Sequence, residues 1–157
     1  MFYNALRFVH LLSVSVWVGM VVFFTLFATP ALFKHLPRET AGDVVGVLFP
    51  RYWAVGYAAA FMSLATLLAL SYIGKTLPAA RLALIIFMTA LTLYSGLVVS
   101  ARAREVKGLV REAPDGESKD GLKKEFRSLH ARSAAMNMAV LLSGVALIYL
   151  ISREMER

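Results

Sequence analysis

The chain has 157 residues, of which 59% are hydrophobic and 17% charged, and its mean hydropathy is +0.65. Soluble domains are about half apolar and about a quarter charged, so this composition indicates an integral membrane protein. The formal charge of +7 does not indicate nucleic-acid binding, because the basic residues lie next to apolar segments. The absence of cysteine excludes disulfides, thiolate metal sites and thiol oxidation.

Four apolar segments are long enough to cross a bilayer, whose hydrocarbon core requires ~20 helical residues. They are residues 8–29, 52–73, 82–100 and 133–151. The first is longer than the ~7 to 15 residues of a signal-peptide core, so we expect it to be retained as a helix. The sequence therefore predicts an all-α fold, an integral membrane four-helix bundle that forms a single domain over residues 1–157.

The connections between these segments also contain helical patterns. In the first connection, RETAGDVVGVLF places Val44, Val47 and Leu48 on one side of a helix, which predicts a short interfacial helix that ends at Pro50. In the third, EAPDGESKDG is a turn cluster between charged extensions of two helices, so we expect those helices to project as a hairpin. The short second connection, residues 74–81, predicts an antiparallel pair.

The distribution of basic residues predicts the orientation in the membrane. Twelve of the 17 Lys and Arg residues lie in the first and third connections, and five lie at the ends and in the second connection. The positive-inside rule therefore places the two long connections in the cytoplasm and both termini on the non-cytoplasmic side.

The fourth span contains only 20 residues without charge, Ser133 to Ser152, so Asn137 must lie inside the bilayer. Polar groups near this depth are costly without partners. We expect an inner polar cluster near the cytoplasmic surface, formed by Arg51, Tyr52, Arg127, His130, Ser133 and Asn137. The alternative is structural: amides and hydroxyls in membrane bundles form interhelical hydrogen bonds of ~0.6 kcal/mol, and arginines anchor to headgroups.

A second polar group lies near the outer surface, on the first span. His10, Ser13 and Trp17 share one side of this helix and are candidate cofactor-binding residues. His10 and His130 are the candidate metal ligands, because neutral imidazole suits transition metals. They lie near opposite surfaces, so they cannot bind one metal ion together. Alternatively, His10 is an interfacial residue capped by Ser13.

Several classes of activity lack their usual residues. All ten acidic residues lie outside the four spans, which argues against a proton- or sodium-coupled pump. The chain also lacks a Walker loop, an HExxH zinc motif and a Gly-x-Ser-x-Gly elbow. The sequence therefore favours a protein that is not an enzyme.

Three stretches, RFVHLLSVSVWVG, FATPALFKHLPRETAGDVVGVLFPRYW and FRSLHARSAAMN, resemble the family of small four-helix membrane proteins related to transmembrane protein 205. The resemblance runs from about Phe8 to Asn137. That family is similar in turn to a broader group containing copper-resistance protein D and the membrane protoporphyrinogen oxidase of haem synthesis. A histidine in the early helix of that group is implicated in haem binding, so the resemblance implies that His10 is a ligand.

Three interpretations of function stay open. The first is a binding or transport module for a metal or haem-type ligand, with haem b or a transition metal as the cofactor. The second is a noncatalytic membrane scaffold or partner subunit, within a homo-oligomer or bound to a membrane partner protein. The third is a haem-dependent membrane oxidoreductase, with His10 as the axial ligand and Trp17 beside the haem.

Overall fold

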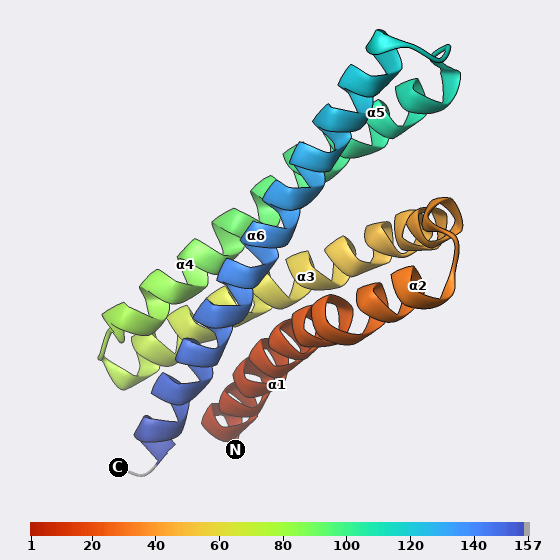
Figure 1. Cartoon of the computed structure of the whole chain (residues 1–157). Coiled ribbons are helices and arrows are strands. Elements are labelled where there is room, and N and C mark those ends of the chain that lie inside the picture. Colours follow the sequence, from red (N-terminus) through yellow and green to blue (C-terminus); the bar gives the residue numbers. More distant parts are fainter. Residues whose placement is uncertain (156–157) are drawn as a thin grey trace.

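The structure is a computed structural model that describes residues 1–155, with side chains described for residues 1–153. Four long helical stretches, each long and apolar enough to cross a membrane, form an antiparallel bundle (Figure 1). This confirms the predicted all-α four-helix fold. The elements are α1 (Phe2–Val22), η1 (Phe23–Ala28), α2 (Thr29–His35), α3 (Arg38–Gly74), α4 (Ala79–Tyr94), η2 (Ser95–Val99), α5 (Ser100–Glu112) and α6 (Glu117–Met155), of which η1 and η2 are π-helical turns.

The two ends of the bundle differ in their connections. One end, called the terminal end below, carries the start of α1, the end of α6 and the short turn between α3 and α4 (Figure 1). The other, called the long-loop end, carries the α2–α3 and α5–α6 turns. Lys75 ends α3 in the left-handed conformation, with φ 51°, and Pro78 caps the start of α4. The predicted antiparallel pair is therefore present.

The predicted interfacial helix is part of a longer helix. Residues 38–49 are helical, as expected, but α3 continues through Pro50 to Gly74 without a break. Pro50 is exposed, while Phe49, Tyr52 and Trp53 beside it in the sequence pack against one another. The buried side of the first half is also different from the prediction, because it consists of Ala41 and Val45, whereas Val47 is 65% exposed.

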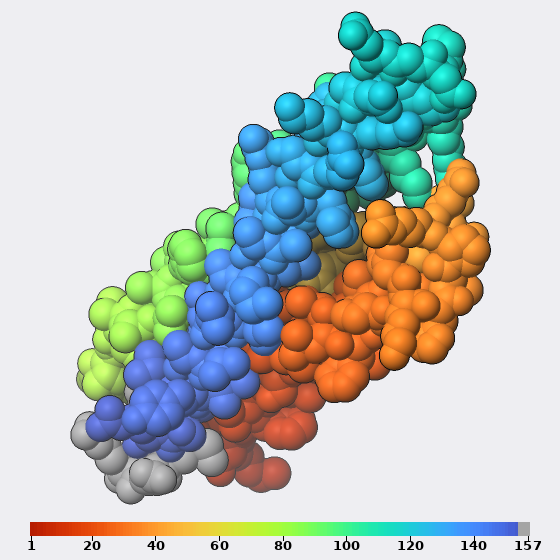
Figure 2. Space-filling model, in the orientation of Figure 1, coloured from red at the N-terminus to blue at the C-terminus, as the bar shows by residue number. Residues whose placement is uncertain are grey.

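The predicted charged hairpin at the long-loop end is confirmed. α5 and α6 run on from the membrane-spanning segments and are joined by a short turn at residues 113–116. An ion pair of 2.9 Å between Arg102 and Glu125 links the two helices. Figure 2 shows the tip of this hairpin extending past α2 and the start of α3. Lys107 and Arg111 on α5 both bind the Asp43 carboxylate on α3, which ties the hairpin to the rest of the bundle.

An aromatic layer, formed by Phe24, Phe49, Tyr52, Trp53 and Tyr57, contacts both π-helical turns. Phe24 in η1 lies 4.8 Å from the Tyr52 ring, measured between ring centroids. In η2, a Cβ added at Gly96 would overlap the Trp53 ring, so only glycine allows this approach. The Trp53 indole also donates a hydrogen bond of 3.2 Å to the Ser100 hydroxyl, just after η2. The two π-helical turns therefore both lie against this aromatic layer.

Candidate binding pocket at the terminal end

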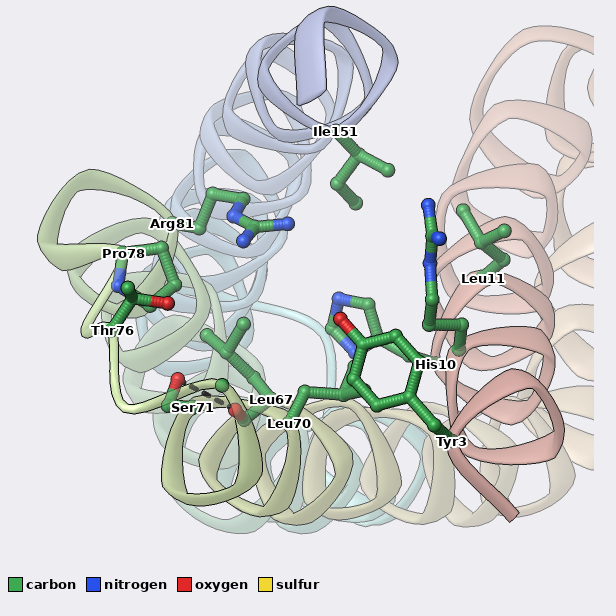
Figure 3. Close-up of a pocket in the computed structure, with 12 residues that line it drawn as sticks. Tyr3, His10, Leu11, Leu67, Leu70, Ser71, Thr76, Pro78, Arg81 and Ile151 are labelled. Atoms are coloured by element: carbon green, nitrogen blue, oxygen red, sulfur yellow. Dashed lines mark hydrogen bonds between the residues drawn. The ribbon is translucent and has the colours of Figure 1, made fainter. Parts of the chain in front are cut away.

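A pocket of about 240 Å³ opens at the terminal end, between α1, α3, α4 and α6 (Figure 3). Its walls combine apolar side chains with hydroxyl, imidazole and guanidinium groups. The lining residues are Tyr3, Arg7, His10, Leu11, Leu67, Leu70, Ser71, Gly74, Thr76, Pro78, Arg81 and Ile151. All four membrane-spanning stretches or their connections contribute to it, so the pocket depends on the tertiary arrangement of the bundle.

His10 lies in this pocket, and its orientation is set by Thr66 on α3. The His10 side chain is 2% exposed, and its Nδ1 lies 2.9 Å from the Thr66 hydroxyl oxygen. The Thr66 hydroxyl has one proton, which it donates to the Met62 carbonyl oxygen at 2.7 Å. With that proton engaged, we assign the hydroxyl oxygen as the acceptor of a hydrogen bond from His10 Nδ1–H. In the neutral imidazole this leaves Nε2 without a proton.

The second ring nitrogen, Nε2, is buried and has no hydrogen-bond partner among the described residues. Leaving a buried polar atom unsatisfied costs ~1 to 3 kcal/mol, so such atoms are rare in folded proteins. Figure 3 shows the imidazole ring facing the open centre of the pocket. The arrangement therefore presents a single lone pair to whatever occupies the pocket.

The mouth of the pocket is basic. Arg7 lies one turn before His10 on α1, and its guanidinium lies 6.0 Å from the centroid of the Tyr3 ring. Arg81 stands on the opposite wall, at the start of α4 (Figure 3). Among the lining residues, all of them described, there is no carboxylate. The pocket lining therefore includes two cationic side chains.

The base of the pocket is closed by the apolar core. One turn further into the bundle than the lining residues lie Val14 on α1, Ile85 on α4 and Leu147 on α6, each no more than 1% exposed. Beside them, a Cβ added at Gly144 would overlap Val18, which shows how closely α1 and α6 approach. The pocket is thus open at one end only.

The other two residues of the predicted outer group do not line the pocket. Ser13 donates its hydroxyl proton to the Val9 carbonyl oxygen at 2.7 Å, so it is bound to its own helix and does not cap His10. Trp17 is fully buried in the core, and its indole nitrogen has no hydrogen-bond partner among the described residues. Of the predicted cofactor-binding residues, His10 alone lies in the pocket.

The predicted inner polar cluster is not assembled. Arg51, Arg127 and His130 are exposed or half-exposed, while Tyr52 is buried within the aromatic layer. Ser133 forms an interhelical hydrogen bond of 3.1 Å with Ser95, as in the structural alternative. Asn137 is half-buried, and no side-chain hydrogen bond joins it to another described residue. These six residues do not form a common site.

The two candidate metal ligands lie far apart, as the sequence predicted. His130 precedes the pocket residue Ile151 by 21 positions on the continuous helix α6, a distance of about 31 Å along the axis. Within the described part of the chain, no group of three or more His, Cys, Asp or Glu side chains is placed to hold a metal ion. A metal at His10 would therefore have to bring its other ligands with it.

Sequence reasoning misses the partners of His10. Thr66 is one of three Ser and Thr residues in the second span, and nothing in the sequence pairs it with His10. Arg7 and Arg81 stand out in the sequence only as charges flanking the spans. The available signal is their position: each lies within a turn of the predicted membrane edge, at the same end as His10.

Comparison with known proteins places the chain in a family. A family model described as a domain of unknown function, DUF4149, matches residues 12–112. The chain belongs to the DUF4149 family. It is also similar to an uncharacterised protein of Aquifex aeolicus, at 28% identity over 128 residues, which cover 82% of this chain and 83% of that protein. No solved structure matches.

The match to the DUF4149 family model covers three of the four predicted spans. The matched residues 12–112 include Thr66 and Arg81 but begin just after His10. The resemblance to proteins related to transmembrane protein 205 and to copper-resistance protein D is not established by these matches and stays a prediction. The chain is therefore a multi-pass membrane protein of the DUF4149 family.

Proposed function

We propose that this protein is a ligand-binding module of the membrane, with the terminal-end pocket as its site and His10 Nε2 as the atom that contacts the ligand. The observation that carries this proposal is the buried, unpartnered Nε2 in a pocket of about 240 Å³, held in place by the Thr66 hydrogen bond on Nδ1. Ligand-binding histidines commonly have one ring nitrogen fixed in this way and use the other.

The pocket supports binding and not free passage. Its base is closed by fully buried apolar side chains, among them Ile85 and Leu147. A ligand that enters from the terminal end therefore meets the core just beyond His10. Transport would require this apolar layer to separate, so binding is the simpler function for this geometry.

The sequence led us to expect a metal or haem-type ligand. The donor atoms and the volume of the pocket both restrict such a ligand. Within the described residues no three His, Cys, Asp or Glu side chains gather to hold a metal ion, so a metal at His10 Nε2 would need most of its ligands from elsewhere. The cavity of about 240 Å³ is also below the ~300 to 1,000 Å³ of pockets that enclose drug-sized ligands. A porphyrin does not fit within it, and we derive no haem chemistry from this site.

The proposed function is tested by purifying the full chain in a mild detergent and identifying the small molecules, metals and chromophores released on denaturation. We expect one compound, near one molecule per chain, to be lost from His10→Gln. The matched control is His130→Gln, because His130 lies far from the pocket and does not line it. If both variants retain the same compounds as the unmodified protein, the pocket is not a binding site.

A second function, that of a partner subunit, is favoured by the projecting α5–α6 hairpin. Its exposed ion pairs, such as Lys119 with Asp115 at 2.9 Å, lie at a tip that stands clear of the bundle. A cytoplasmic or membrane protein could dock there. Replacing residues 113–116 with a two-glycine turn should abolish such an assembly and leave pocket binding intact, as measured by native gel mobility and by the released compound.

A further inference from the structure

We propose that the ligand of the terminal-end pocket is a neutral hydroxyl compound, an alcohol or a phenol with an apolar body. Its O–H would donate a hydrogen bond to His10 Nε2. Its apolar body would lie against Leu11, Leu67 and Ile151. This ligand class rests on the proposed binding function and adds the chemistry by which the pocket would recognise its ligand.

The unpartnered nitrogen of His10 calls for a hydrogen-bond donor on the ligand. Nδ1–H is assigned to the Thr66 oxygen at 2.9 Å, so Nε2 of the neutral ring has a lone pair and no proton. An ionised carboxylate has acceptors only and would leave Nε2 unsatisfied. A phenol, like the tyrosine side chain, has a pKa of ~10, and an alcohol is weaker still as an acid. Both therefore keep their O–H at neutral pH.

Among hydrogen-bond donors, a hydroxyl fits the lining of the pocket best. An ammonium group has three donors and no acceptor, and no lining residue carries a carboxylate to receive it. A hydroxyl is neutral, and its oxygen accepts a second hydrogen bond while its proton goes to Nε2. The lining contains donors for that oxygen, among them the side chains of Tyr3 and Arg7. A neutral amide nitrogen donates but does not accept in this way.

The walls beside His10 are apolar and leave room for a small body. Leu11, Leu67 and Ile151 stand around the centre of the pocket (Figure 3). The Ser71 hydroxyl donates to the Leu67 carbonyl oxygen at 2.8 Å, so its proton is already used (Figure 3). A cavity of ~150 Å³ in a protein core holds benzene. The pocket of about 240 Å³ therefore accommodates a six-membered ring with a hydroxyl and a further small substituent.

The experiment uses the full chain in dodecyl maltoside, with isotope-labelled histidine rings and the His10 Nε2 resonance as the readout of binding. The first two probes are para-cresol and its methyl ether, in which a methyl group replaces the hydroxyl proton. We expect para-cresol to shift the resonance saturably and the ether to bind at least about tenfold more weakly, because the ether leaves Nε2 without a donor.

A third probe, cyclohexanol, separates the two sources of a hydroxyl group. A shift with both cyclohexanol and para-cresol indicates a site for alcohols and phenols alike. A shift with para-cresol alone indicates a site for phenols, and a shift with cyclohexanol alone indicates a site for alcohols. Each of these results supports the proposed class.

Narrowing the pocket tests where the probe binds. Ile151→Phe places a larger side chain against the cavity and should weaken para-cresol binding at least about tenfold. The matched control is Ile148→Phe on the same helix, because Ile148 is exposed and does not line the pocket. Its affinity for para-cresol should be that of the unmodified protein.

Four results would overturn the inference: a proton on Nε2 in the unliganded protein, no shift with either hydroxyl probe, equal binding of para-cresol and its methyl ether, or equal binding by the two isoleucine variants. If the hydroxyl probes fail while His10→Gln still loses its co-purified compound, the binding function survives and this ligand class does not.

Discussion

The hydrogen bond between His10 and Thr66 joins α1 to α3 and decides which nitrogen faces the pocket. His10 Nδ1 lies 2.9 Å from the Thr66 oxygen, whose proton is donated to the Met62 carbonyl oxygen. The threonine therefore has two roles, one in stability and one in positioning. Valine has nearly the shape of threonine without its hydroxyl, so Thr66→Val tests both roles.

Thr66→Val should remove the hydroxyl acceptor of His10 Nδ1–H and lower the free energy of unfolding by ~1 kcal/mol. It should also weaken ligand binding about 10- to 100-fold, as loss of a positioning partner commonly does. Thr66→Ser keeps the hydroxyl and should retain most of the binding. Unfolding midpoints and ligand titrations of both variants check this. Equal binding by the Thr66→Val and Thr66→Ser variants would show that Thr66 does not orient His10.

Individual residues also show what the sequence could not predict. His10 stands out in the sequence because a histidine next to an apolar run is uncommon and needs a reason. Its partner Thr66 depends on how α1 and α3 cross, which periodicity does not give. The inner cluster failed for a related reason: burial of Tyr52 and Trp53 fixes the rotation of α3 and turns Arg51 outward.

Among the helices, α1 and α6 pack closely against each other, and both contribute to the wall of the pocket. A Cβ at Gly144 would lie 2.6 Å from Val18 Cγ2 and 3.3 Å from Met88 Cε, so α6 approaches its neighbours through a glycine. Small residues at such contacts are how membrane helices pack closely. The same helix contains Gly121, in the projecting hairpin, where nothing lies within 4 Å of an added Cβ.

Gly144→Ala should therefore lower the free energy of unfolding by ~1 to 3 kcal/mol through overpacking. Gly121→Ala should raise it by up to ~1 kcal/mol, because alanine favours the helix and meets no obstacle. Thermal unfolding of the two variants in the same detergent provides the comparison. If Gly144→Ala is as stable as Gly121→Ala, α1 and α6 are not in close contact at this level.

The sequence predicted which helices exist better than it predicted where each helix begins and ends. The four long apolar helices were predicted correctly, because hydropathy over ~20 residues is a strong signal. Pro50 was expected to end a helix, yet α3 passes through it. The π-helical turns η1 and η2 had no signal in the sequence, since they arise where α1–α2 and α4–α5 adjust to the aromatic layer.

For the whole molecule, the two ends have different chemistry. The terminal end holds the pocket, and the long-loop end holds the charged hairpin and the ion pairs of Asp43. The positive-inside rule predicts that the long-loop end is cytoplasmic, so the pocket would open on the other side. A ligand would then reach His10 from outside the cytoplasm or from the outer leaflet.

The absence of cysteine makes this orientation simple to test. Single-cysteine variants Lys75→Cys, in the turn at the terminal end, and Asp115→Cys, in the hairpin turn, are both at exposed positions. A maleimide that does not cross membranes should label the first variant in intact cells and the second only after the membrane is opened. The reverse pattern would mean that the pocket opens to the cytoplasm.

The account depends most on one feature, the lone pair of His10 Nε2 presented to the pocket. Nitrogen NMR of isotope-labelled histidine side chains measures it directly, with His10→Gln to assign the resonance. We predict a neutral His10 ring with the proton on Nδ1 and an Nε2 signal that shifts when the pocket is filled. A proton on Nε2 in the unliganded protein, or an Nε2 signal unchanged by every compound that binds, would contradict the account.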